Sequence, residues 1–129
     1  MSILFSGVAQ DHELMDSLRK VIPTRKDDDS MKVLQMNSLA FEYSYIDLDS
    51  GKRIAEKALE LAEATNFKRG KAGIYNTIGT IYHDQANFQK AVECFTIARK
   101  FSEQGTYKSM KHMSAVIYAN LANTYESMG

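Results

Sequence analysis

The chain has 129 residues, of which 44% are hydrophobic and 25% are charged. This length suits one domain that buries its core without disulfide or metal support. Basic and acidic residues both number 16, so the zero net charge gives no bulk attraction to nucleic acid or anionic lipid. The single Cys94 excludes an intramolecular disulfide. No apolar run approaches the length of a membrane span, so direct membrane insertion by this segment is not expected.

Residues 1–10 differ in composition from the rest of the chain. An apolar run, ILF, is followed by small residues, with Gly7 and Ala9 suited to a peptidase site. A full secretory signal also needs a basic start and a longer apolar core, and both are missing. We interpret this stretch either as the remnant of a signal peptide or as a disordered or helix-leading N-terminus. The first interpretation places the protein in the periplasm, and the second in the cytoplasm.

Residues 11–22 predict a short amphipathic leading helix. Its apolar side consists of Leu14, Leu18, Val21 and Ile22. Pro23 ends the helix, because proline lacks an amide hydrogen and restricts the residue before it. The loop that follows holds three consecutive aspartates, Asp27 to Asp29, whose charge suits the N-terminus of the next helix. We expect these carboxylates to be solvated, and we predict no metal site.

Two pairs of helices are predicted next, over residues 31–65 and 68–104. In the first pair, Asp49 or Ser50 can cap the second helix. In the second pair, one face of each helix is marked by Tyr75, Ile78, Gly79 and Tyr82 and by Ala91, Phe95 and Ala98. Small residues there are opposite bulky ones, so the two helices are expected to approach closely.

Residues 107–128 predict one more helix, which reaches Gly129 without a partner. Its Tyr118, Leu121, Ala122 and Tyr125 repeat the spacing found at the start of the second pair. The first pair offers Leu39, Ala40 and Tyr43 and then Ala55, Leu59 and Ala62 at matching positions. Because Ala55 comes 12 positions after Tyr43, whereas Ala91 comes 9 after Tyr82, the first pair is expected to carry three extra residues around its turn.

These spacings resemble the tetratricopeptide repeat, whose helix pair carries large-x2-Leu-Gly-x2-Tyr and then Ala-x3-Phe-x2-Ala. The departures are Tyr75 in place of tryptophan, Ile78 in place of leucine and Glu103 in place of proline. The resemblance covers about residues 31–129. It implies an all-α fold, a right-handed α-solenoid of about six helices in antiparallel hairpins over residues 11–129. The leading helix is then expected to pack like the second helix of a preceding repeat.

The resemblance also implies a binding surface on the concave face, which the first helix of each pair forms. By position this surface would offer Asn37, Phe41, Ser44, Asn76, Thr80, His83, Ala119, Asn123 and Glu126. Their amides and hydroxyls suit an extended peptide backbone, although the same residues also suit a merely solvated helix face. None of them is basic, so capture of a peptide's C-terminal carboxylate is not expected.

The unpaired last helix predicts a second kind of surface. It would expose an apolar stripe made of Val116, Tyr118, Leu121 and Tyr125. A second copy of the chain could bury this stripe and form a homodimer, or the two copies could exchange helices. Alternatively, the next repeat of a longer protein covers it.

Motifs for catalysis are missing from the sequence. The three histidines form no HExxH pair, and no CxxC, glycine-rich phosphate loop or GxSxG elbow occurs. We therefore predict neither enzyme activity nor a cofactor. Nucleic-acid binding is not supported either, because the tyrosines at helical spacing have no basic stripe beside them.

The predicted function is a non-catalytic module that binds a protein or peptide partner. The long repeats, and the pattern that runs from Asp49 to Ala62, resemble tetratricopeptide arrays of Bacteroidetes-type histidine kinases and transcriptional regulators. That resemblance implies the sensory or interaction region of a larger bacterial signalling protein. The alternatives are a dimerisation element or a stand-alone adaptor that uses the unpaired C-terminal helix.

Overall fold

The structure, a computed structural model, describes the backbone of residues 2–105 and 108–129 and, within these ranges, the side chains from residue 12 onward. The described chain is helical throughout and contains no strand. Its elements are α1 (Ser2–Val21), the 3-10 helix η1 (Ile22–Thr24), α2 (Ser30–Ser44), α3 (Leu48–Ala64), α4 (Lys68–Asp84), α5 (Phe88–Glu103) and α6 (Lys108–Met128). The predicted all-α fold with six α-helices is confirmed.

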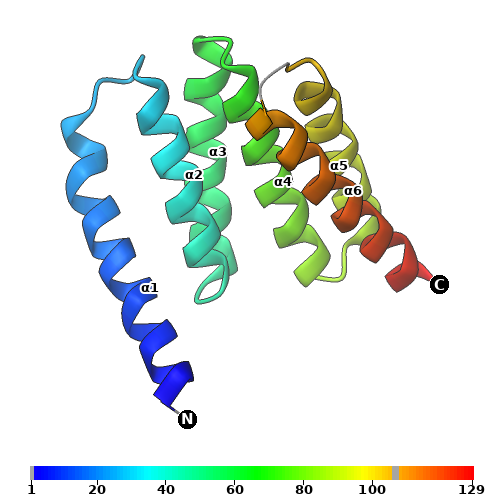
Figure 1. The fold of residues 1–129 in the computed structure, drawn as a ribbon, viewed down its shortest axis with the longest axis horizontal. Helices are drawn as coiled ribbons and strands as arrows, with labels where there is room; N and C mark the ends of the chain where they lie inside the picture. The colour runs from blue at the N-terminus through cyan, green and yellow to red at the C-terminus, as the bar shows by residue number, and fades with distance from the viewer. Residues whose placement is uncertain (1, 106–107) are drawn as a thin grey trace.

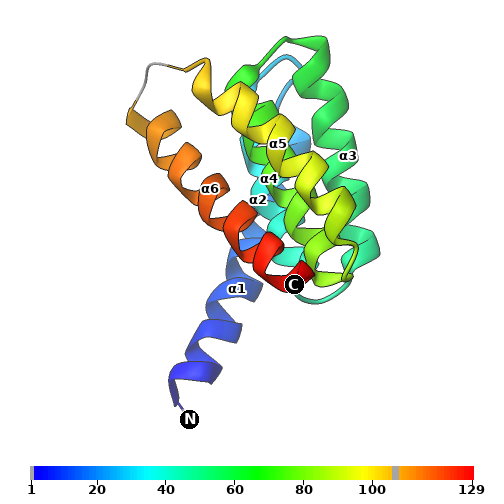
Figure 2. The same ribbon diagram turned by 90° about the vertical axis from the view of Figure 1, so that its right-hand side faces the viewer.

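The helices stack as antiparallel hairpins (Figure 1). Helices α2 and α3 form the first hairpin, and α4 and α5 form the second. Helix α6 packs on α5 and α4 at the C-terminal end, and α1 lies against α2 at the other end. Seen from the side, α3 lies across the stack from α6 (Figure 2). Each unit covers the apolar face of its neighbour, as in a tetratricopeptide-like α-solenoid.

Helix α1 is longer than the predicted leading helix. It begins at Ser2 rather than at residue 11, because residues 2–10 contain no proline that would stop a helix earlier. Its N-terminal half extends beyond the other helices (Figure 2). The structure shows helix in this stretch, where a signal-peptide remnant, a disordered segment and a helix-leading segment were the interpretations left open. The signal-peptide interpretation stays a prediction.

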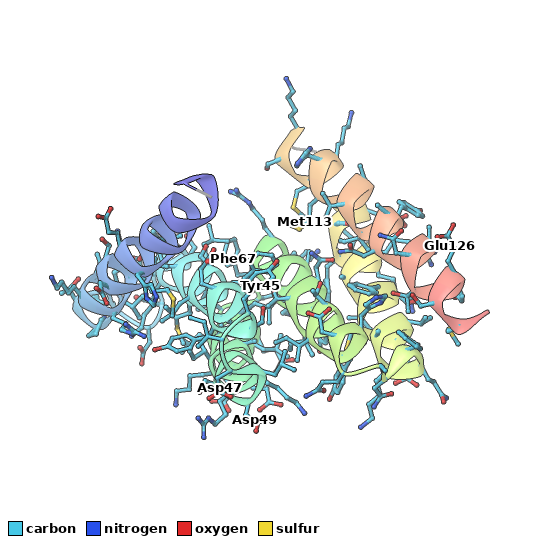
Figure 3. All side chains as sticks on the ribbon, turned by 90° about the horizontal axis from the view of Figure 1, so that it is seen from below. Tyr45, Asp47, Asp49, Phe67, Met113 and Glu126 are labelled. Carbon is cyan, nitrogen blue, oxygen red and sulfur yellow. The ribbon has the colours of Figure 1, made fainter. Side chains whose placement is uncertain are left out.

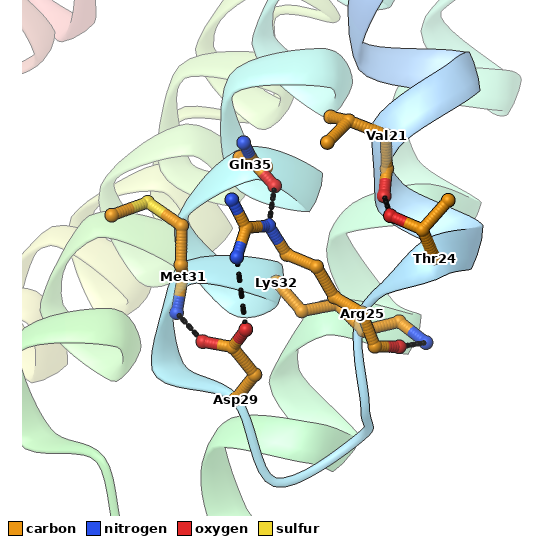
Figure 4. Close-up of polar contacts among 7 residues, drawn as sticks. All are labelled: Val21, Thr24, Arg25, Asp29, Met31, Lys32 and Gln35. Atoms are coloured by element: carbon orange, nitrogen blue, oxygen red, sulfur yellow. Dashed lines mark hydrogen bonds and ion pairs between the residues drawn. The ribbon is translucent and has the colours of Figure 1, made fainter.

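The loop between α1 and α2 is held by its own charges (Figure 4). Arg25 donates from Nη1 to Asp29 Oδ2 at 3.0 Å and from Nε to Gln35 Oε1 at 2.7 Å. The other carboxylate oxygen of Asp29 accepts a hydrogen bond from the backbone N–H of Met31, so Asp29 caps α2 as its position predicts. These bonds together hold the pKa of Asp29 below its ordinary value, the backbone bond contributing most.

The two hairpin turns have the same length, which contradicts the expected insertion in the first. Helix α2 ends at Ser44 and α3 begins at Leu48, just as α4 ends at Asp84 and α5 begins at Phe88. Asp47, rather than Asp49 or Ser50, is the N-cap of α3, and it accepts a hydrogen bond from the backbone N–H of residue 49. The cap therefore lies at the same point of the turn as Asn87, which caps α5.

The buried residues of α3 and α5 correspond at a spacing of 40 residues. They are Gly51, Ala55, Ala58 and Ala62 in α3 and Ala91, Phe95, Ala98 and Ser102 in α5. The matching of Ala55, Leu59 and Ala62 to the second-helix pattern was therefore wrong by one turn. A Cβ atom on Gly51 would lie 2.9 Å from the carbonyl oxygen of Ala40. The crossing of α2 and α3 thus depends on a glycine that the pattern search missed.

The centre of the fold is the contact between α4 and α5. A Cβ atom on Gly79 would lie 2.6 Å from Cε1 of Phe95, whose side chain is 1% exposed. The predicted close approach of small and bulky residues is confirmed at this point. Phe95 belongs to a core cluster that continues through Ile117 and Leu121 of α6, so the same side chain joins the hairpin to the last helix.

Candidate functional site

The concave face of the stack contains a hollow of about 310 Å³, which we call the inner groove. Four helices contribute to it, because α2 and α4 form its floor while α1 and α6 stand on either side. It is lined by Leu14, Asn37, Ser38, Phe41, Glu42, Gly73, Asn76, Thr77 and Met113. Figure 3 shows Met113 on the side of α6 that faces α4.

The floor of the inner groove is built around Asn37 on α2. Its Oδ1 atom is buried and has no hydrogen-bond partner among the described residues. Its Nδ2 atom lies 3.0 Å from the place where a Cβ atom on Gly73 would stand. The glycine in α4 therefore makes room for the amide. Next to it, Thr77 is buried and donates its hydroxyl to the Gly73 carbonyl at 3.1 Å.

A second amide pair ties α4 to α6. Asn120 donates from Nδ2 to Asn76 Oδ1 at 2.8 Å. The Nδ2 group of Asn76 and the Oδ1 atom of Asn120 remain available to a ligand, since no hydrogen bond in the described chain uses them. Asn37, Asn76 and Asn120 thus place one amide on each of three successive helices of the concave face.

The walls of the inner groove are apolar. Leu14 on α1 is 44% exposed and Phe41 on α2 is 37% exposed. The Phe41 ring also makes an edge-on contact with Tyr45, with ring centroids 5.3 Å apart. Among the described residues of the lining, Glu42 is the one ionisable residue. The groove therefore combines an amide floor with hydrophobic walls and a single acidic group.

A smaller hollow of about 170 Å³ lies between α4 and α6. Thr80, His83, Phe95, Asn120 and Asn123 line it. The His83 ring nitrogen Nδ1 is 3.0 Å from the hydroxyl of Thr124, which is fully buried. This bond joins the two helices and leaves little room for a ligand. We assign it a structural role.

The predicted concave residues divide into three groups. Asn37, Phe41 and Asn76 meet in the inner groove, and Thr80, His83 and Asn123 line the smaller hollow. Ser44 does not belong to the surface, because it is buried at the end of α2 and donates its hydroxyl to the Phe41 carbonyl at 2.6 Å. Ala119 and Glu126 are exposed but line neither hollow.

Eight lining residues were missed by the sequence analysis: Leu14, Ser38, Glu42, Gly73, Thr77 and Met113 in the inner groove, and Phe95 and Asn120 in the smaller hollow. Met113 and Asn120 lie seven positions apart, which puts them on one face of α6 and could have been noticed. Their direction, however, depends on how α6 packs on α5 through Ile117 and Leu121. The contribution of α1 depends on its angle to α2, which no sequence pattern encodes.

The predicted self-association stripe is only partly exposed. Val116, Tyr118 and Tyr125 are 39%, 50% and 56% exposed, but Leu121 is 7% exposed. The expectation for Leu121 was wrong, because this side chain packs into the cluster around Phe95. On the surface, the Tyr118 hydroxyl donates to Glu103 Oε1 at 2.5 Å.

Other chemistry is not evident in the described part of the chain. No group of histidine, cysteine or acidic side chains gathers there in a way that could hold a metal ion. Burial raises the pKa of the Cys94 thiol to about 11, so this thiol is protonated near neutral pH and is not an activated nucleophile. None of the described helices is long and apolar enough to cross a membrane.

A larger hollow of about 530 Å³ lies at the far end of the molecule. Residues of the α3–α4 link and of the link between α5 and α6 line it, among them Phe67, Arg69, Gly105 and Met110. It borders residues 106 and 107, which lie outside the described chain. We therefore base no site on it.

Comparison with protein families agrees with this geometry. The tetratricopeptide repeat model matches residues 72–96, which span most of α4 and the first half of α5. The match supports the tetratricopeptide repeat family. Repeats of this family are generally non-catalytic and bind proteins, so a protein-interaction module is the coarse function that follows. Neither the curated proteins nor the solved structures gave a significant match. A kinase or regulator relationship gains no support from these comparisons.

Proposed function

We propose that the inner groove binds an extended segment of a partner protein. The observation that carries this proposal is the Asn37 amide, whose oxygen lies unpaired in the floor of a hollow with apolar walls. An unpaired buried acceptor costs roughly 1–3 kcal/mol, which a bound N–H group would recover.

The neighbouring groups suit the rest of a peptide. Asn76 lines the groove and its Oδ1 atom is occupied by Asn120, so its free N–H group can donate to a backbone carbonyl of the peptide. Leu14 and Phe41 offer an apolar contact surface for a side chain of the peptide. Burying their exposed apolar surface removes it from water, which favours binding. Main-chain hydrogen bonds with side-chain pockets beside them are a common mode of peptide recognition.

The proposal is tested with a displayed library of random 12-residue peptides. We expect enrichment of peptides with at least one large apolar residue. For an enriched peptide, Asn37→Ala and Phe41→Ala should each raise the dissociation constant by about tenfold, measured by fluorescence polarisation. Gln89→Ala, which changes an exposed polar residue on α5, is the matched control and should leave the affinity unchanged. No enrichment, or equal affinity for all four proteins, would contradict the proposal.

We propose a sensory or interaction region of a larger bacterial signalling protein as the wider setting, and it rests on the sequence resemblance alone. The gene sequence on both sides of this segment tests it. Further repeats followed by an apolar span of about 20 residues and an output domain would support the sensory role. Stop and start codons at the two ends would favour the stand-alone adaptor instead.

A further inference from the structure

Helix α6 presents a face that no other part of the described chain covers. The face consists of Lys111, Ala115, Tyr118, Ala122, Tyr125 and Glu126, all of them exposed, and we call it the α6 face. Its first five residues follow one another at spacings of 4, 3, 4 and 3 positions. That spacing is the seam of a helix that pairs lengthwise with another helix.

The corresponding face of α4 shows what such a seam does when it is covered. Tyr75 stacks on Phe101 of α5, with ring centroids 6.2 Å apart. The Phe95 ring packs against Gly79, and the Lys90 ammonium group of α5 lies over the Tyr82 ring. In α6 the matching Tyr118, Ala122 and Tyr125 are exposed, and no other described helix covers them. The α6 face is therefore built for a helical partner.

The charges of α6 oppose its own dipole. Lys108 and Lys111 lie in its first turns, where the dipole is positive, and Glu126 lies in its last turn, where it is negative. Neither Lys111 nor Glu126 makes an ion pair with another described residue. They are 15 positions apart, or about 22 Å along the helix, so they cannot pair with each other.

We propose that the α6 face binds the α6 face of a second copy, with the two helices antiparallel. In this arrangement Lys111 of each copy meets Glu126 of the other, and both ion pairs form at once. Each lysine then lies near the negative end of the second dipole, and each glutamate near the positive end, so the unfavourable placements become favourable. A two-fold axis generates both contacts from one surface, as an isologous dimer requires.

The size of the side chains agrees with this pairing. Ala115 and Ala122 lie on either side of the centre of the seam and would face each other across the antiparallel pair, where small residues let two helix axes come within about 8 Å. Tyr118 lies between them and Tyr125 lies beyond Ala122, so both add large apolar surfaces. Tyr118 is held in place by its bond to Glu103 and by the Arg99 guanidinium over its ring, so its ordering costs little on binding.

The inference does not depend on the inner groove and is tested with the full 129-residue chain by sedimentation velocity. One helix pair is at the low end of interface sizes, so we expect a reversible dimer with a dissociation constant on the order of 10–100 µM. Lys111→Glu and Glu126→Lys should each raise this constant about tenfold, because each replaces two attractions by two repulsions. The double variant should restore the original value.

Rescue by the double variant is specific to the antiparallel pair, since parallel helices would place Lys111 against Lys111. Circular dichroism separates this effect from unfolding, because both single changes favour the dipole of α6 and should keep the helix intact. Ala122→Arg should abolish the dimer by blocking close approach, and Asn37→Ala should leave it unchanged. A chain that is monomeric at 500 µM, roughly five times the weakest expected dissociation constant, would overturn the proposal. A dimer whose dissociation constant does not change with Lys111→Glu or Glu126→Lys would also overturn it.

Discussion

Helices α4 and α6 contain the same pattern of residues, but the pattern is covered in α4 and exposed in α6. Gly79 in α4 is buried under Phe95, whereas the matching Ala122 in α6 is exposed. Tyr75 and Tyr82 are half-buried, whereas Tyr118 and Tyr125 are about half exposed or more. The pattern therefore identifies a face that is able to pack. It does not tell whether a partner is present.

The difference has a simple physical origin. Helix α4 lies between α2 and α6 and is also covered by α3 and α5, so nearly every face of it is buried. Helix α6 packs only on α5 and α4, through Ile117 and Leu121 on one side. Substitutions at matching positions should therefore have very different effects on stability in the two helices.

The largest contrast is expected between Phe95 and Tyr118. Phe95→Ala removes a fully buried ring and should lower the free energy of unfolding by about 4 kcal/mol. Tyr118→Ala removes a half-exposed ring and one surface hydrogen bond, so it should cost less than about 1 kcal/mol. Urea titration of both variants measures the difference. Equal losses would mean that Phe95 does not join the hairpin to α6 as described.

The matched glycine and alanine give the next contrast. Gly79→Leu forces a side chain into the Phe95 ring and should destabilise the protein by about 3 kcal/mol. Ala122→Leu adds the same kind of side chain on the exposed face and should change stability by no more than about 0.5 kcal/mol. The comparison is made by thermal unfolding at a protein concentration well below the dissociation constant expected for the proposed dimer. A large loss from Ala122→Leu would show that α6 is covered within one copy.

Thr124 tests how α6 is attached to α4. Its buried hydroxyl lies 3.0 Å from His83 Nδ1, and Thr124→Val keeps the shape of the side chain while removing this contact. A loss of about 1–2 kcal/mol is expected. Thr80→Val is the control, because the Thr80 hydroxyl bonds only within its own helix. If both variants are equally stable, the bond to His83 contributes nothing.

The smallest contrast concerns the caps of the two hairpins and is visible only in acid. The pKa of Asp47 lies below its ordinary value, because its carboxylate accepts a hydrogen bond from the Ser50 hydroxyl. Hydrogen bonds from backbone N–H groups contribute less. Its contribution is thus present above the ordinary carboxyl pKa and is lost as the pH falls through the lowered one. Asp47→Asn should destabilise the protein at pH 7, and the difference between the two proteins should shrink as the pH falls below the ordinary carboxyl pKa.

Asn87 caps α5 through its amide oxygen, which accepts from the backbone N–H of Lys90 at 3.4 Å. Because this group does not titrate, Asn87→Ala should cost about 1 kcal/mol at every pH between 3 and 7. Urea titrations at several pH values separate the two caps. A pH-dependent loss for Asn87→Ala would contradict the assignment.

The inner groove shows where prediction from the sequence ended. The family resemblance pointed to Asn37, Phe41 and Asn76, and the structure brings these three residues together in the inner groove, while their role in binding stays a prediction. The prediction that Ser44 belongs to the concave surface was wrong, because the chain turns at the end of α2 and buries this side chain in the hairpin. Asn120 was missed because the rotation of α6 about its axis is set by Ile117 and Leu121 packing on α5.

By itself the sequence determined the helices, their pairing into hairpins and the close contact of Gly79 with Phe95. These features follow from periodicity and side-chain size along one or two neighbouring helices, which are local properties. The tertiary structure alone decided the wall that α1 supplies to the groove, the bond between Asn76 and Asn120, and the burial of Leu121 beside the exposed face of α6. Each of these depends on crossing angles and rotations that many side chains set together.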